Sequence, residues 1–263
     1  MTPSFVTRSS RALTGLSKLG LAMVGAIALL GSAPAAAAVL NFESQLPTVY
    51  AGGEFFDENG FRLSVIDTHG DGTGLAGGIV NGSDPTTCAL GGCPSGNSTN
   101  FYIGVVDGAA TITRNWADAT FRLRGFDFSF MAPVGGLAAG SYGQLQLTGN
   151  LLGGGTIFTA LDFPSAVDAS GNPMFGSAML AADFMNATLT SLNIRACIND
   201  GTSCIFPDDN SPLISQAQFG IDNIDLAEVP EPGSMALIGL GMGALALRRR
   251  KSSVSQPATT VAA

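Results

Sequence analysis

The chain has 263 residues, with twenty acidic and twelve basic side chains and a formal net charge of −8 at pH 7. Residues 39–228 contain nineteen acids, five arginines and no lysine, which gives this segment a net charge of −14. A surface this acidic does not neutralise phosphates, which excludes nucleic acid as a partner. A segment of about 190 residues is long enough for one domain with a sizeable core.

The first 38 residues have the organisation of a secretory signal peptide. Basic residues precede the apolar run 19–30, and small residues follow as far as an Ala-x-Ala cleavage site at 36–38. We expect a helical signal peptide over 1–38, which signal peptidase removes to leave Val39 as the mature N-terminus. An uncleaved signal anchor is the alternative, and the shortness of the apolar run argues against it.

Residues 39–228 predict an all-β domain. The segment is rich in glycine, threonine, serine and asparagine, and no long stretch shows a sustained 3.6-residue period. A short helix is expected near Ser177–Met185. The predicted strands are Val39–Phe42, Phe61–Ile66, Phe101–Val106, Ala110–Thr113, Thr120–Phe130, Gln144–Gly149, Thr156–Leu161, Thr188–Ala196 and Gln218–Leu226.

The segment Thr120–Phe130 has the clearest strand pattern. Its apolar side chains alternate in one phase up to Leu123 and in the opposite phase over Phe126–Phe130. A β-bulge at Arg124-Gly125 explains the change of phase, because glycine permits the required backbone conformation. The phenylalanines suit either a sandwich core or an aromatic platform for carbohydrate, and the strand-like spacing favours the core.

Four cysteines are typical of an exported protein, and they allow three disulfide connectivities. We favour the two local pairs, Cys88 with Cys93 and Cys197 with Cys204, each of which closes one loop. A metal site is the weaker alternative, because neither pair has the Cys-x-x-Cys spacing.

Motifs of known catalytic families are missing from the sequence. The single histidine, His69, lies in the stretch 67–74, which weakly resembles a calcium loop but is better interpreted as a Gly/Asp turn. A serine and an aspartate could still partner His69, and paired carboxylates for glycoside hydrolysis depend on distances that sequence does not give.

Trp116 is the only tryptophan of the chain. It follows Arg114-Asn115, so we expect it in a turn between strands, where it is partly exposed. A flat exposed ring matches the apolar face of a pyranose, which makes Trp116 the first candidate glycan contact. The alternative is a tryptophan that covers the edge of the sandwich.

The two ends of the domain carry a resemblance to a known fold. Asn41-Phe42-Glu43 is followed by a Gly-Gly-x-Phe-Phe-x-x-x-Gly-Phe stretch, and the domain closes with Phe-x-Ile-Asp-Asn-Ile at 219–224. These residues resemble the jelly-roll of secreted carbohydrate-binding-type modules. That resemblance implies a β-sandwich with a structural calcium held by Glu43 and Asp222 together with backbone carbonyls. The alternative is that Asp222 hydrogen-bonds to the neighbouring backbone.

The C-terminal segment 229–251 has three parts. The prolines at 230 and 232 give a stiff extended segment around Glu231. Met235–Leu247 is apolar but short for a bilayer span, which needs about 20 residues. A basic cluster follows, where the positive-inside rule expects cytoplasmic residues. The residues that define the motif are Pro230, Glu231, Pro232, Arg248, Arg249 and Arg250.

This order resembles the PEP-CTERM sorting signal of Gram-negative bacteria, also known as an ice-binding-protein C-terminal motif. The closing stretch Gln218–Asp222 is similar to the QFxxD subgroup of these proteins. The resemblance implies a transient anchor in the inner membrane, recognition by exosortase, and a place at the cell surface or in an exopolysaccharide or biofilm matrix. An ordinary tail anchor is the alternative. Residues 252–263 are expected to be a disordered tail.

Taken together, the sequence predicts a jelly-roll-like β-sandwich over 39–228, between an N-terminal signal-peptide helix and a short C-terminal transmembrane helix. The predicted function is that of an exported, non-catalytic protein associated with exopolysaccharide. A secreted hydrolase on the same scaffold and a purely structural or adhesive protein are the alternatives. No cofactor other than structural calcium is expected.

Overall fold

The computed structural model describes residues 37–88, 92–117, 119–133, 136–229 and 239–242. The described residues up to Val229 belong to one compact unit. Its elements are β1 (Ala37–Leu40), β2 (Thr48–Ala51), β3 (Phe55–Glu58), β4 (Phe61–Ile66), β5 (Leu75–Asn81), η1 (Pro85–Thr87), β6 (Asn100–Gly104), β7 (Ala109–Arg114), β8 (Thr120–Phe130), β9 (Gly143–Leu151), β10 (Thr156–Asp162), β11 (Gly176–Ser177), α2 (Ala182–Asn186), β12 (Leu189–Asn199), β13 (Cys204–Ile205) and β14 (Phe219–Val229).

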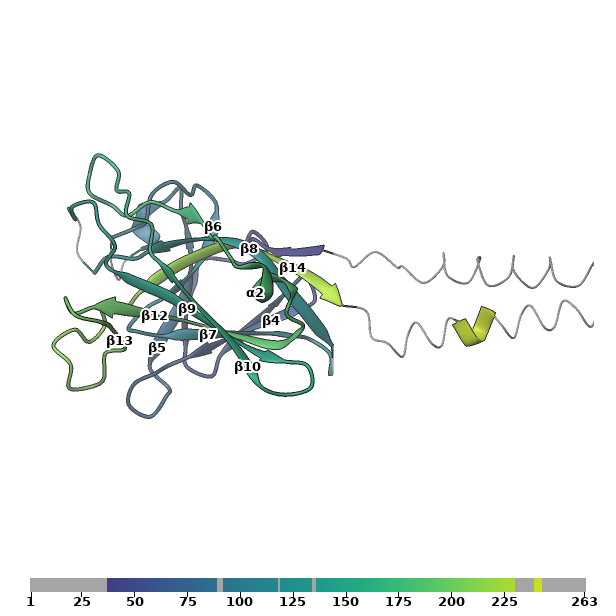
Figure 1. The fold of residues 1–263 in the computed structure, drawn as a ribbon. Helices are drawn as coiled ribbons and strands as arrows, with labels where there is room; N and C mark the ends of the chain where they lie inside the picture. The colour runs from purple at the N-terminus through teal and green to yellow at the C-terminus, as the bar shows by residue number, and fades with distance from the viewer. Residues whose placement is uncertain (1–36, 89–91, 118, 134–135, 230–238, 243–263) are drawn as a thin grey trace, which may run out of the picture. The chain divides into compact units, whose positions relative to one another are not determined.

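The strand register divides this unit into two antiparallel layers (Figure 1). One layer has the order β10-β9-β12-β7-β4-β3. The other has the order β2-β5-β6-β14-β8-β11, with β1 beside β14 beyond the end of β6. A single pairing of Leu189 with Phe121 joins the layers, and Gly53 N–H donates to the carbonyl of Val65 near the opposite edges. The predicted all-β sandwich is therefore confirmed.

Strand β8 confirms both predictions made for it. Gly125 faces Asp225 while Leu123 faces Leu226, so Arg124 is one extra residue in the ladder. The β-bulge therefore lies at Arg124 and Gly125, and the alternation of buried side chains along β8 changes phase across it. The four phenylalanines of β8 are core residues, each no more than 4% exposed: Phe121, Phe126, Phe128 and Phe130.

All nine predicted strands are present, with ends displaced by a few residues, and α2 lies at the end of the predicted helix. The disulfides join Cys88 to Cys93 and Cys197 to Cys204, which confirms the two local pairs. Strands β2, β3, β5, β11 and β13 were not predicted. Each of them is short, glycine-rich or at an edge, where alternation is weak.

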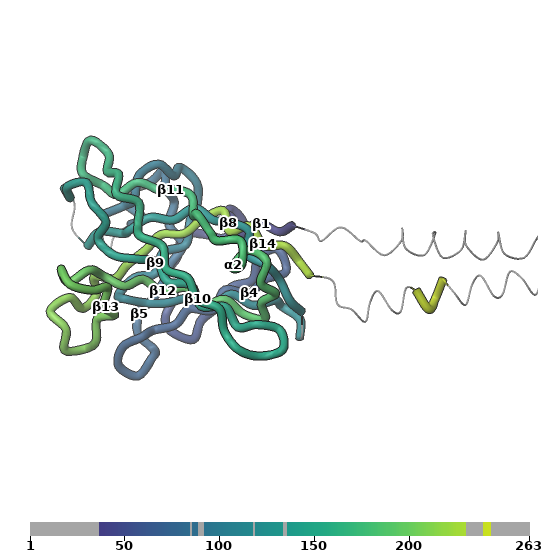
Figure 2. The backbone as a smooth tube through the Cα atoms, viewed as in Figure 1, coloured from purple at the N-terminus to yellow at the C-terminus, as the bar shows by residue number. Residues whose placement is uncertain are grey.

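The two terminal strands of the sandwich lie side by side (Figure 2). Ala37 of β1 pairs with Ala227 of β14, so β1 starts within the expected signal-peptidase site. The expected signal-peptide helix and the expected span at 235–247 lie almost wholly outside the described residues. Within the expected span only residues 239–242 are described, and they form one helical turn. Where the chain is described, none of its helices has the length and apolarity needed for a membrane span.

Candidate functional site

The outer surface of the layer that contains β12 carries mainly uncharged polar side chains on β9, β12 and β7. In an antiparallel sheet, residues directly opposite one another point to the same face. One row of such partners crosses all six strands from Phe158 on β10 to Phe55 on β3. Its members, in order, are Phe158, Thr148, Asn193, Thr111, Ser64 and Phe55. We call this surface the polar face.

A second row on the same face is displaced from the first by two residues along each strand, towards the end of the sandwich where Val229 lies. Asn150 Nδ2 donates to Ser191 Oγ over 2.7 Å within this row, and Asn193 Nδ2 donates to Thr111 Oγ1 over 3.3 Å in the first. These bonds hold the amides in place while each amide keeps acceptor capacity for a further partner. The second row consists of Thr156, Asn150, Ser191, Thr113, Arg62 and Asp57.

Two exposed aromatic rings end the first row. Phe158 is 56% exposed and Phe55 is 51% exposed, although both belong to strands. The guanidinium of Arg62 lies 3.8 Å from the centre of the Phe55 ring, and this contact fixes the ring at the edge. Five strand spacings separate the two rings, or about 24 Å at 4.8 Å per strand.

The composition of the polar face determines what it can bind. Amides and hydroxyls both donate and accept hydrogen bonds, as sugar hydroxyls do, and an aromatic ring stacks on a pyranose. Within the two rows the only acid is Asp57, whose Oδ1 accepts from Arg62 Nε at 2.9 Å. The face is thus suited to an extended neutral ligand that makes many weak contacts.

A polar hollow of about 360 Å³ adjoins the face at the end remote from Val229. Gln144 and the β12–β13 turn line it, including Asn199, Thr202 and Ser203. Next to it, the guanidinium of Arg195 lies 4.2 Å from the centre of the Phe206 ring. The segment 200–217, which we call the wall, therefore borders this end of the polar face with its residues 201–206.

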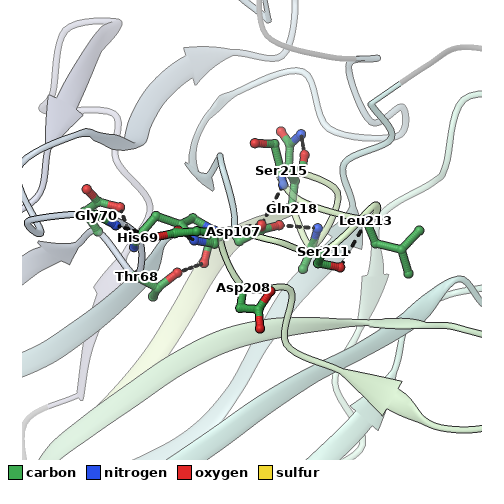
Figure 3. A network of polar contacts seen from close by, with 12 residues as sticks. Thr68, His69, Gly70, Asp107, Asp208, Ser211, Leu213, Ser215 and Gln218 are labelled. Atoms are coloured by element: carbon green, nitrogen blue, oxygen red, sulfur yellow. Dashed lines mark hydrogen bonds and ion pairs between the residues drawn. The ribbon is translucent and has the colours of Figure 1, made fainter.

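A second polar cluster ties that wall to two other loops (Figure 3). His69 Nε2 lies 2.9 Å from Asp107 Oδ2, and His69 Nδ1 lies 2.7 Å from Asp209 Oδ1. The buried Asp107 also accepts the backbone N–H groups of Ser215 and Ala217, both at 2.6 Å. Burial lowers the pKa of His69, but the bonds to the two carboxylates outweigh it and raise the pKa overall.

The stretch 67–74 forms the turn that the sequence predicts. The turn is the predicted Gly/Asp type, since Asp67 accepts the backbone N–H groups of His69 and Gly74. His69 is nevertheless more than a turn residue, because it links the loop to Asp107 and Asp209, which are distant in sequence. Both ring nitrogens of His69 face carboxylate oxygens, and Ser215 contributes its backbone N–H to Asp107.

The two residues expected to hold calcium lie on either side of the segment 97–100. Glu43 Oε1 accepts the N–H of Asn100 at 2.7 Å. The side chain of Asp222 is fully buried and accepts from Asn97 Nδ2 at 2.7 Å and from Thr99 Oγ1 at 3.2 Å. Burial raises the pKa of Asp222 to about 6, against the lowering effect of these bonds.

The arrangement around Asp222 does not fit a calcium ion as it stands. Calcium takes six to eight oxygen ligands, whereas both carboxylate oxygens of Asp222 already accept from N–H or O–H donors. Among the described residues, no three Asp, Glu, His or Cys side chains converge in a way that could hold a metal. Calcium at Glu43 and Asp222 stays a prediction.

Trp116 lies in the β7–β8 loop and is 56% exposed, as the sequence predicts. The guanidinium of Arg114 lies 4.4 Å from its ring centre. Trp116 is not part of the two rows of the polar face.

The sorting residues Pro230, Glu231, Pro232 and Arg248–Arg250 lie outside the described residues. Sequence reasoning missed Phe55, Phe158 and the polar rows, although their alternation is visible in Gln144–Asn150.

Comparison with known proteins gives one sequence match. Residues 228–251 match the PEP-CTERM protein-sorting motif, and no curated protein matches the chain. The similar solved structures include TmCBM61 in complex with β-1,4-galactotriose (10% identity, 72% of this chain and 94% of that chain covered, TM-score 0.33). They also include the enzymatically active domain of bacteriophage CBA120 tailspike protein 4 (12% identity, 65% of this chain and 20% of that chain covered, TM-score 0.28). Both TM-scores are below 0.5, and neither likeness bears on ligand or activity.

Proposed function

We propose that this protein, which carries the PEP-CTERM sorting motif at residues 228–251, is a non-catalytic component of a surface or extracellular matrix that binds polysaccharide through its polar face. The motif indicates an exported, secreted protein that is transiently anchored and then processed by exosortase. Association with exopolysaccharide or biofilm is the further step that we propose.

The observation that carries the proposal is the row from Phe158 to Phe55. It combines hydrogen-bonding groups of one kind, uncharged amides and hydroxyls, with an aromatic ring at each end. An extended, neutral and hydroxyl-rich chain is the ligand class that this combination suits. The lack of carboxylates in the middle of the rows supports binding without hydrolysis, since glycoside hydrolysis needs two of them.

The proposal is tested by binding of the exported protein to neutral and acidic polysaccharides, in affinity gels and on a glycan array, with and without calcium. Replacing Asn193 or Phe158 by alanine should weaken binding about 5- to 30-fold, the equivalent of 1–2 kcal/mol. Leu46→Ala is the control, because Leu46 is 82% exposed but lies outside the two rows. Equal binding by all variants would remove the polar face from the proposal.

The sorting step has a separate test. Replacement of Pro230, Glu231 and Pro232 by alanine should leave the protein at full length in the inner membrane, because exosortase recognises this motif. Release at the normal mature mass would contradict the role assigned to the motif. This outcome is independent of any ligand of the polar face.

A further inference from the structure

One end of the sandwich is where β14 finishes at Val229, and we call it the exit end. Val229 pairs with Thr120, the first residue of β8. Leu189, the first residue of β12, pairs with Phe121 on β8 and with Leu151, the last residue of β9. The exit end therefore consists of the Asn115–Ala117 loop, the turn after Leu151 and the start of β12.

The exit end displays two large apolar side chains. Trp116 is 56% exposed and Leu152 is 57% exposed. Trp116 is held in this position by packing, because Arg114 stacks on its ring and a Cβ at Gly60 would lie only 3.3 Å from it. Since Arg114 itself is paired with Glu228, the exposed tryptophan is coupled to the end of β14, where the match to the sorting motif begins.

Charge is distributed unevenly between the two ends. Four of the five arginines of residues 39–228, Arg62, Arg114, Arg122 and Arg124, lie on strand segments near the exit end, where they offset the acids Asp57, Glu58, Asp183 and Glu228. The opposite end has Arg195 alone among many aspartates. The acids in the loops and at the strand ends there are Glu54, Asp67, Asp71, Asp107, Asp162, Asp168, Asp200, Asp208 and Asp209.

The sequence limits how far the exit end can be from a membrane. Five residues, Pro230 to Ser234, separate Val229 from Met235, where the apolar segment begins. Six steps of a polyproline conformation reach about 19 Å at 3.1 Å per residue. The acidic end is a further length of β14 away, about 37 Å for its eleven residues, which is several times the screening length of about 8 Å.

We propose that the exit end rests on the phospholipid headgroups of the membrane while the protein is anchored, with Trp116 and Leu152 in the interfacial region. Tryptophan is the side chain most suited to that region, because its ring is apolar and its N–H finds a polar partner. The short tether keeps the membrane surface at a high effective concentration near the exit end, so a weak contact is enough to hold the two together. The inference rests on the transient anchoring that the sorting motif indicates.

The single tryptophan provides a direct test. The unprocessed chain is purified from cells that lack exosortase and reconstituted into phosphatidylethanolamine–phosphatidylglycerol vesicles, with and without brominated acyl chains. We expect Trp116 emission to shift to shorter wavelength and to fall at least two-fold with brominated lipid. The exosortase-processed protein, mixed with the same vesicles, should show neither effect.

A matched variant moves the reporter to the acidic end. In a Trp116→Phe background, Phe206→Trp places the only tryptophan at a site that is 40% exposed in the native chain, and it should not be quenched. If the chain floats with the vesicles but Trp116 is not quenched, or is quenched no more than Trp at position 206, the inference is overturned. The anchoring itself is not contradicted by that result. A chain that does not float with the vesicles contradicts the anchoring itself and the inference with it.

Discussion

Arg114 at the end of β7 forms an ion pair with Glu228, the residue before the last in β14. The side chain of Arg114 is 3% exposed and that of Glu228 is 34% exposed. Removing one partner of a buried pair leaves an uncompensated charge, at a cost of 3–5 kcal/mol in fully buried cases. Because Glu228 is partly solvated, we expect Glu228→Gln to lower the free energy of unfolding by about 2 kcal/mol.

Urea denaturation of residues 39–263 measures this loss. Asp57→Asn is the matched control, since Asp57 and Arg62 form a pair of the same type in which both side chains are about 40% exposed. Exposed pairs contribute little, so the control should unfold close to the wild-type midpoint. Equal losses in the two variants would show that burial of Arg114 does not set the strength of its pair.

The sequence predicts the framework of this fold better than its surface. The alternation in Thr120–Phe130 and the glycine at 125 predict both the strand and its bulge, because a buried face and a backbone requirement are local properties. The local disulfides follow from cysteine spacing for the same reason. Strand β5 was missed, because its stretch Leu75–Asn81 is buried on both faces and has no alternation.

The candidate sites depend on register, which sequence does not give. Phe55 and Phe158 are 103 positions apart and become two ends of one row only when six strands are aligned. His69 and Asp209 likewise meet through loops whose paths no local pattern sets. Only the three-dimensional structure therefore determines which of these residues face one another.

Burial of Asp222 predicts a dependence of stability on pH. Its pKa is about 6 in the folded protein, against an ordinary value of 3.8. A carboxyl with a raised folded pKa contributes stability that is fully present below pH 3.8 and is lost as the pH rises through about 6. Asp222→Asn cannot ionise, so the wild-type-minus-variant difference in unfolding free energy should fall by on the order of 3 kcal/mol between pH 3.5 and pH 7.5. A flat difference would contradict the raised pKa.

Calcium binding remains a prediction with its own measurement. If Glu43 and Asp222 hold calcium, a chelator should lower the melting temperature of the wild-type protein and leave the double variant Glu43→Ala, Asp222→Ala unchanged. Saturating calcium at 100 times its dissociation constant would add about 2.7 kcal/mol of stability. Identical wild-type melting with and without chelator would show that hydrogen bonds alone satisfy Asp222.

His69 predicts a second pH effect, centred on the loops. Both of its ring nitrogens face carboxylate oxygens, and only the protonated imidazole donates to Asp107 and Asp209 at once. These bonds outweigh burial and raise the pKa of His69 above 6.5. A histidine with a raised folded pKa contributes stability that is present below its unfolded pKa and is lost as the pH rises through the folded value.

The attachment of the 208–217 segment should therefore loosen as the pH rises above 6.5. Hydrogen exchange of the backbone amides of Ser215 and Ala217, which donate to Asp107, reports the attachment locally. We expect their protection, corrected for the intrinsic rate, to fall with pH in the wild type and to stay level in His69→Gln, whose amide does not titrate. The charge of Arg195, which lies near Asp107, is constant over this range, so it does not contribute to the slope. Parallel profiles in the two proteins would place the pH dependence elsewhere.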